Sequence, residues 1–231
     1  MPRETLTRDK VLAAALRLAD AHGLAWLSMR KLASELGVEA MSLYNHVASK
    51  GDLLDGMASL VFELIELPDP ALPWPDRIRA LGIGAHNAFS AHPVVVGALA
   101  SDQANPRSIG ALRLIDALLG ALLDAGLDER AAAQRYRSLL GLLFGLVLSD
   151  SMTAAGDRPE RDVPIADWFG RAATADALPS LHRVLPALLD QDCAPDVEQE
   201  IEFFITGVRS VARAGRGHRM STIEVSRPAD S

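Results

Sequence analysis

The residue types that could do chemistry are concentrated between positions 30 and 50, where basic, aromatic and short polar side chains alternate with apolar ones. The candidates are Arg30, Ala40, Met41, Ser42, Tyr44, His46 and Lys50. The Tyr44 hydroxyl can donate to a phosphate while its ring stacks on a sugar, and His46 and Lys50 can also reach a phosphate. Arg30 can reach a guanine edge or a phosphate. These side-chain types favour contact with a nucleic-acid duplex.

Two short helices are expected to position these side chains. The pattern predicts one helix from Ser28 to Leu36 and a second over about 40–47, joined by a tight turn. Gly37 can adopt the left-handed conformation that such a turn requires. Leu43 and Val47 anchor the second helix from below, which leaves its other face free to enter a major groove. The N-terminus of that second helix also favours a phosphate.

The motifs in this segment resemble those of a known family. Residues 28–38 read SMRKLASELGV, residues 43–50 read LYNHVASK, and Leu53-Leu54-Asp55 follow. Residues 7–60 therefore resemble the N-terminal domain of the TetR family. Beyond residue 75, helix number and length fit the family's regulatory domain, especially in the tetracycline-repressor-like branch.

The resemblance implies that the seven candidates face double-stranded operator DNA. It also implies a repressor that binds a palindromic operator as a homodimer and is released by a small-molecule effector. Ala40-Met41-Ser42 stand where the repressor that gives the branch its name has Gln-Pro-Thr. We therefore expect base readout to differ. Alternatives for single residues remain, because His46 could serve in the core or as a cap, and Tyr44 could be half-buried.

Composition and charge point in the same direction. Ala and Leu dominate and aromatic residues make up 5% of the chain, which favours helices over sheets. The net charge of −7 argues against a chain that coats nucleic acid everywhere, yet all three lysines lie within residues 1–52. A single cysteine, Cys193, excludes a disulfide framework within one chain, and no His-Glu-x-x-His run is present. We therefore expect no cofactor and no metal.

The predicted fold is all-α, with an N-terminal three-helix helix-turn-helix domain followed by a larger helical bundle. Thr7 caps the first helix, and Ser49 with Asp52 forms a capping box that opens a linking helix over 52–66. Four prolines between 68 and 75 mark the boundary. We predict a DNA-binding domain over 1–67, a sensing and dimerisation domain over 75–215, and a disordered tail over 216–231.

Breaks in the pattern divide the second domain into further helices. His92-Pro93 interrupts the first, a short helix runs to about Ser101, and Asn105-Pro106 starts a long one that ends at Gly126. Asp128 caps the next helix, which reaches about Thr153. A loop with helical pieces is predicted over 156–177, and the last two helices over 178–189 and 195–214.

Two of these helices have the pattern of an interface between subunits. The first carries apolar residues at 4-3-4-3 spacing, namely Val197, Ile201, Phe204, Val208 and Val211. The second, around 139–148, is apolar nearly all round and is expected to be buried on all sides, with Gly141 and Gly145 allowing close approach. An ordinary core within one chain is the alternative. The family resemblance implies a four-helix bundle between subunits.

The effector site is expected among polar residues on otherwise apolar helices. The leading candidates are His86, Asn87 and His92, which fall on the helix that lines the pocket in the resembled branch. Each could equally be a solvated or capping residue. Five more polar residues could line a cavity: Asp102, Gln103, Asn105, Arg113 and Tyr136.

Two other functional classes are compatible with the sequence. One is a helical enzyme or carrier with a hairpin that does not bind DNA, and the other is a regulator that acts through a protein partner. No nucleophile elbow, Gly-rich phosphate loop or paired carboxylates support an enzyme. The N-terminus lacks an apolar signal core, and the longest apolar run is shorter than the roughly 20 residues of a membrane span. We therefore expect a cytoplasmic protein.

Overall fold

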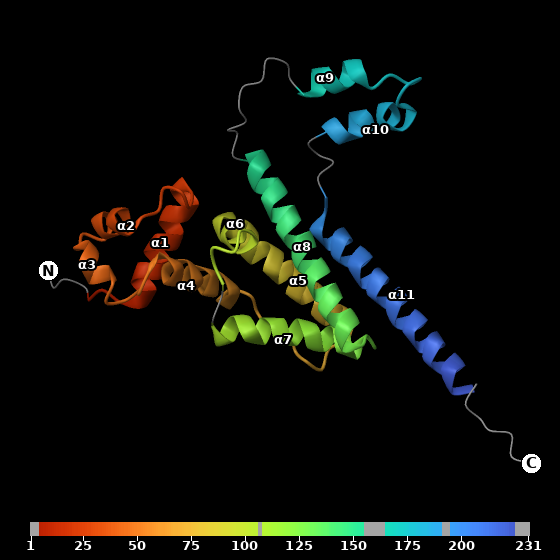
Figure 1. The fold of residues 1–231 in the computed structure, drawn as a ribbon, viewed down its shortest axis with the longest axis horizontal. Helices are drawn as coiled ribbons and strands as arrows, with labels where there is room; N and C mark the ends of the chain where they lie inside the picture. The colour runs from red at the N-terminus through yellow and green to blue at the C-terminus, as the bar shows by residue number, and fades with distance from the viewer. Residues whose placement is uncertain (1–4, 106–107, 155–164, 191–194, 225–231) are drawn as a thin grey trace, which may run out of the picture.

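The protein folds as two groups of helices joined by a proline-rich segment. The structure, a computed structural model, describes residues 5–105, 108–154, 165–190 and 195–224. Within these ranges every regular element is a helix, so the predicted all-α class is confirmed. Figure 1 shows the N-terminal helices on one side of the molecule and the longer helices of the bundle beside them.

The first group contains α1 (Arg8–His22), α2 (Met29–Glu35), α3 (Ala40–Leu43) and α4 (Lys50–Glu63). The N-caps predicted at Thr7 and Ser49 are present, and Ser28, expected as the first residue of its helix, caps α2. The hydroxyls of Thr7, Ser28 and Ser49 accept hydrogen bonds from the amides three residues later, at 3.3, 3.3 and 3.1 Å. The Asp52 carboxylate also accepts a hydrogen bond from the Ala48 amide, at 2.8 Å, just before the N-cap.

Three predicted helix boundaries in this region are wrong. The third helix was expected to reach Val47, but α3 ends at Leu43, and the amides of Tyr44 and His46 bond to carbonyls only three residues back. The backbone thus tightens into turns after the first helical turn. The linking helix α4 begins at Lys50 instead of 52 and ends at Glu63 instead of 66, again through bonds that span three residues at Leu64 and Ile65.

The second group is a bundle built around α5 (Trp74–Ala91). Helices α7 (Ile109–Asp124), α8 (Glu129–Ala154) and α11 (Val197–Glu224) pack against it, and α6 (Pro93–Ala100) lies between α4 and α8. As predicted, Pro93 starts a new helix after His92, and the Asp128 carboxylate caps α8 by accepting from the Ala131 amide at 2.8 Å. Helix α5 approaches α11 so closely that a Cβ at Gly82 would lie 2.8 Å from Ile201.

Two more helices lie at the end of α8 and α11 in Figure 1. They are α9 (Ile165–Ala172) and α10 (Pro179–Leu189), and they pack on each other. Helix α9 falls in the predicted loop with helical pieces, of which residues 155–164 lie outside the described ranges, as does Cys193.

The predicted tail is wrong over residues 216–224. Helix α11 continues to Glu224, ten residues past the expected end at Ala214. Gly215 lies within this helix, because a glycine inside a helix costs only about 1 kcal/mol and need not end it. Residues 225–231 lie outside the described ranges.

One hydrophobic core runs through both groups. Leu27, Leu32 and Leu43 fill the N-terminal part, while Phe89, Leu122, Leu139 and Ile205 fill the bundle, all at 2% exposure or less. Helix α4 connects the two, because it packs against α1 at Gly56 and its Phe62 contacts Phe89 in the bundle. In the described part of the chain, no helix is both long and apolar enough to cross a bilayer.

Candidate nucleic-acid interface

The turn between α2 and α3 fixes the direction of the short helix that follows. Gly37 has φ of +64°, the left-handed conformation expected from the sequence, and the Val38 amide bonds back to the Ala33 carbonyl at 3.0 Å. Leu43 and Val47, at 0% and 1% exposure, anchor α3 and the turns after it to the core. The opposite side of α3 is therefore left uncovered.

The seven predicted contact residues lie on α2, on α3 and the turns that follow it, and on α4. Arg30 is exposed on α2, and Lys50 is exposed as the first residue of α4. Met41 on α3 is 74% exposed and Tyr44, just after it, is 46% exposed. The remaining three, Ala40, Ser42 and His46, are partly buried. A large apolar side chain and an aromatic one are thus held in solvent by a helix whose other face is fully packed.

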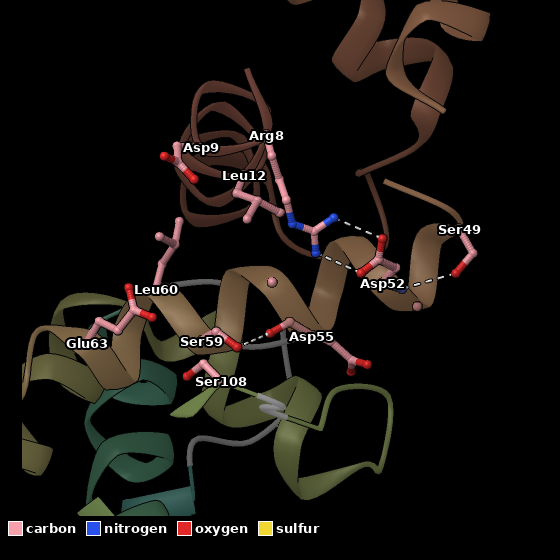
Figure 2. A pocket seen from close by; sticks show the side chains of 12 residues that line it. Arg8, Asp9, Leu12, Ser49, Asp52, Asp55, Ser59, Leu60, Glu63 and Ser108 are labelled. Atoms are coloured by element: carbon pink, nitrogen blue, oxygen red, sulfur yellow. Dashed lines mark hydrogen bonds and ion pairs between the residues drawn. The ribbon is translucent and has the colours of Figure 1, made fainter. Parts of the chain in front are cut away.

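Arg8 ties this segment to α1. Its guanidinium forms two hydrogen bonds with the Asp52 carboxylate, at 2.7 and 3.0 Å, and a third with the backbone carbonyl of His46, at 2.6 Å. The hydrogen bonds to Asp52 raise the pKa of Arg8 above its ordinary value. Figure 2 shows Arg8 reaching from α1 to Asp52, whose backbone amide in turn bonds to Ser49. The end of the α3 segment and the start of α4 are therefore held by one arginine.

Two polar contacts join the first group of helices to the bundle. The Asp55 carboxylate on α4 accepts from the Asn105 amide at 2.7 Å, and His92 Nδ1 lies 2.7 Å from the Asp20 carboxylate of α1. An open groove of about 640 Å³ lies beside the first contact, between α1, α4 and Ser108. Figure 2 shows Asp9 and Glu63 on its walls. These polar contacts thus add to the apolar core that the two groups share, beside an acidic groove.

Known proteins share both the helix-turn-helix and the overall fold. The sequence model of the "Bacterial regulatory proteins, tetR family" matches residues 11–57. An HTH-type transcriptional regulator of Saccharopolyspora erythraea is 34% identical over 185 residues, which cover 79% of this chain and 76% of that protein. The chain belongs to the TetR family. It is therefore a transcriptional regulator and not an enzyme.

More distant TetR-family members extend the similarity to the whole chain. The class A tetracycline repressor protein of Escherichia coli is 30% identical over 224 residues, 93% of this chain and 97% of that protein. The crystal structure of ActR from Streptomyces coelicolor, in complex with actinorhodin, is 26% identical with a TM-score of 0.73, covering 90% of this chain and 99% of that one. The similarity to tetracycline repressors predicted from the sequence is confirmed.

The bundle of this TetR-family chain encloses a small cavity where α4, α5, α7 and α8 meet. Its volume is about 20 Å³, roughly the room for one water molecule. Its walls include Phe62, Ala85, Phe89, Leu118, Tyr136 and Leu143. Tyr136 is the one residue with a polar side chain on the wall, and burial raises the pKa of its hydroxyl above the ordinary value.

The structure brings none of the three leading effector candidates to this cavity. Asn87 is exposed, and His92 pairs with Asp20. His86 is partly buried, with Nε2 at 3.4 Å from the Ser90 hydroxyl and Nδ1 buried without a hydrogen-bond partner. Of the five further polar residues named from the sequence, Tyr136 alone lines the cavity. In the described residues, no group of three His, Cys, Asp or Glu side chains could hold a metal ion.

The predicted subunit seam on α11 faces the chain's own core. Ile201 and Val208 are fully buried, and Val197 and Phe204 pack against the same core, so four of the five seam residues serve the intrachain alternative. The opposite face carries Phe203, at 71% exposure. Helix α8 is likewise not buried on all sides, because Gly141 and Gly145 are exposed and a Cβ on either would meet no atom within 4 Å.

Two residues that matter for the site were missed by sequence reasoning. Arg8 carries no motif signal, because its partners Asp52 and the His46 carbonyl are about forty residues away. Phe62 on α4 looks like any core residue in the sequence, yet it places an aromatic ring on the cavity wall.

Proposed function

We propose that this regulator is a homodimeric repressor that binds a near-palindromic operator and is released by a small-molecule effector. The observation that carries the proposal is the exposure of Met41 and Tyr44 on a segment anchored by Leu43 and Val47. A free apolar side chain and a free phenol on a rigid support fit a helix that enters a major groove. A repressor of this kind acts on chromosomal DNA in the cytosol.

We expect some of these residues to read the base sequence and the others to position the protein on the DNA backbone. Met41 is suited to touch a thymine methyl group, and Arg30 to reach a guanine edge or a phosphate. The Tyr44 hydroxyl, Ser42, His46 and the Lys50 ammonium are suited to bind phosphates. Ala40, partly buried at the start of α3, allows the helix to approach the base pairs closely. Because Met41 is the most exposed residue of α3, we expect it to set sequence preference.

A dimer is supported by the faces that α8 and α11 leave uncovered. Phe203 and Val211 are 71% and 42% exposed on α11, and the open glycines 141 and 145 on α8 allow a second helix to pack closely. The two helices lie side by side in Figure 1 and contact each other. A two-fold axis at this face presents two α3 segments to successive major grooves, about 34–36 Å apart.

Release by an effector requires a site that communicates with α3. The cavity meets this requirement, because Phe62 belongs to α4 and the Arg8–Asp52 pair connects the start of α4 to the segment after α3. A ligand that favours a tilted α4 would move the two α3 segments out of register with the DNA. The complex of the similar ActR with actinorhodin supports a small molecule as the effector class.

A mobility-shift assay on DNA flanking the chain's own gene tests this proposal. The wild-type protein is expected to shift a fragment that contains two half-sites, more weakly at higher salt. Tyr44→Ala should weaken the shift at least about tenfold while its far-UV spectrum stays native, because its side chain is exposed. Absence of a shift by the wild type on every genomic fragment, or an unchanged shift by Tyr44→Ala, would contradict the proposal.

A further inference from the structure

Helix α3 holds a methionine side chain in solvent. Met41 is 74% exposed, whereas Met57 on α4 is 1% exposed and Met29 on α2 is partly buried. These three are the methionines whose side-chain burial the structure describes. Among them, Met41 is therefore the one that a small molecule in solution reaches most easily.

The direction of the Met41 side chain follows from the helix that carries it. Successive residues of an α-helix are about 100° apart, so Met41 lies about 160° around α3 from Leu43, which anchors the helix to the core at 0% exposure. Tyr44, three residues after Met41, lies on the same side and is 46% exposed. The Met41 thioether thus projects from the face of α3 that the proposed function turns toward DNA.

A thioether in this position is open to oxidation by peroxide. Hydrogen peroxide transfers one oxygen atom to the sulfur, which loses two electrons and becomes a sulfoxide, while the peroxide is reduced to water. The step uses no acid, base or leaving group of the protein, so access of peroxide to the sulfur decides which methionine reacts first. Methionine sulfoxide reductases return the sulfoxide to the thioether.

Oxidation changes the property that suits Met41 to a major groove. The thioether is apolar and adaptable, and it fits an apolar neighbour such as the thymine methyl group. The sulfoxide is polar, and its oxygen accepts hydrogen bonds but donates none. Against a methyl group, that oxygen loses its water without gaining a donor, which disfavours the complex. The same base pair that fits the thioether therefore rejects the sulfoxide.

We propose that Met41 is a redox-sensitive modification site, through which peroxide weakens operator binding. This inference rests on the proposed function and gives it a second input, which acts on α3 directly and not through the cavity. A homodimer brings two Met41 side chains to the operator, one in each half-site. Oxidation of both should therefore weaken binding at least about tenfold, because each leaves one buried acceptor unsatisfied.

Peptide mass spectrometry on the full-length protein measures the modification itself. A Cys193→Ser background removes the only thiol of the chain, so that oxidation of the methionines is followed alone. In limiting hydrogen peroxide, Met41 should be oxidised well before Met57, and methionine sulfoxide reductase with dithiothreitol should restore it. Oxidation of Met41 no faster than that of the buried Met57 would overturn the inference.

Mobility-shift titrations measure the effect on DNA binding. Peroxide treatment should weaken the shift at least about tenfold, and the reductase should restore it. Met41→Leu is the matched control, because it keeps an apolar side chain of similar volume without the sulfur, so its shift should be the same before and after treatment. Met41→Gln, which carries a polar amide of similar length, should bind weakly without peroxide. Equal peroxide sensitivity of Met41→Leu and the wild type would overturn the inference.

Further outcomes separate this inference from the function on which it rests. Bound operator DNA should slow the oxidation of Met41, because the complex covers its side chain, and equal rates with and without DNA would contradict the inference. A wild-type shift that survives complete oxidation of Met41 would overturn the inference and leave the proposed function standing. A protein that shifts no DNA before peroxide treatment would instead reject the proposed function.

Discussion

Arg8 on α1 and Asp52 on α4 form a two-point ion pair, and the same guanidinium donates to the His46 carbonyl. This arrangement holds the end of the α3 segment from behind. The pair is partly solvent-exposed, at 43% and 32%, so its contribution to global stability should be at most about 1 kcal/mol. Its importance lies in the position that it gives to Tyr44 and Lys50.

We therefore predict that Arg8→Met weakens operator binding threefold to tenfold without removing a phosphate contact. Plots of log affinity against log salt should keep the wild-type slope, because no counterion release is lost. Lys50→Met is the matched comparison: it should also weaken binding but reduce the slope by about 1. A reduced slope for Arg8→Met would show that Arg8 itself contacts the DNA backbone.

The pair between Asp20 and His92 leads to a second prediction. Asp20 lies near the C-terminal end of α1, where the helix dipole disfavours a negative charge, and its carboxylate meets His92 between α5 and α6. In denaturant unfolding, Asp20→Asn, His92→Ala and the double variant should reveal a coupling free energy of about 0.5–1 kcal/mol.

The same variants test whether this contact joins the two groups of helices. Additive effects of the two substitutions on stability would show that the contact contributes nothing between the two groups of helices.

Substitutions on two opposite faces of α11 should have different effects. Phe203→Glu places a charge on the exposed face and should give a folded monomer that no longer shifts operator DNA, as measured by analytical ultracentrifugation. Ile201→Ala, on the buried face, should instead lower the free energy of unfolding by about 2–4 kcal/mol. A stable dimer of Phe203→Glu would place the subunit interface elsewhere.

Tyr136 predicts a dependence of stability on alkaline pH. Burial raises its pKa in the folded state, so its contribution to stability is fully present below the unfolded value of about 10 and is lost as the pH rises through the folded value. Chemical unfolding at about pH 9 and pH 11 should show a smaller alkaline loss in Tyr136→Phe than in the wild type. Equal losses in the two proteins would indicate that the hydroxyl is solvated.

The local signals in the sequence predicted most of the fold. Thr7, Ser28, Ser49 and Asp128 all cap helices where their types and spacing indicated, and Gly37 takes the expected left-handed turn. Such features depend on a few neighbouring residues. The end of the α3 helix was missed because its last turns are held by the distant Arg8 and by tight bonds that leave no mark in the sequence.

The periodicity of the sequence did not predict which element the apolar face of α11 packs against. The spacing of Ile201 and Val208 identifies an apolar stripe correctly, but the same stripe serves a subunit interface or an internal core, and here it contacts α5. Similarly, His86 and His92 were predicted to line the effector site because they are polar, whereas the cavity is lined almost entirely by apolar side chains. An apolar pocket is indistinguishable from ordinary core in a sequence.

Footprinting of the operator tests the central claim most directly. The wild-type protein should protect two half-sites with centres about one helical turn apart, and Tyr44→Ala should lose both protections together. Methylation of phosphates in both half-sites should interfere with wild-type binding. A single protected half-site bound by a monomer, or wild-type protection retained in full by Tyr44→Ala, would contradict the account.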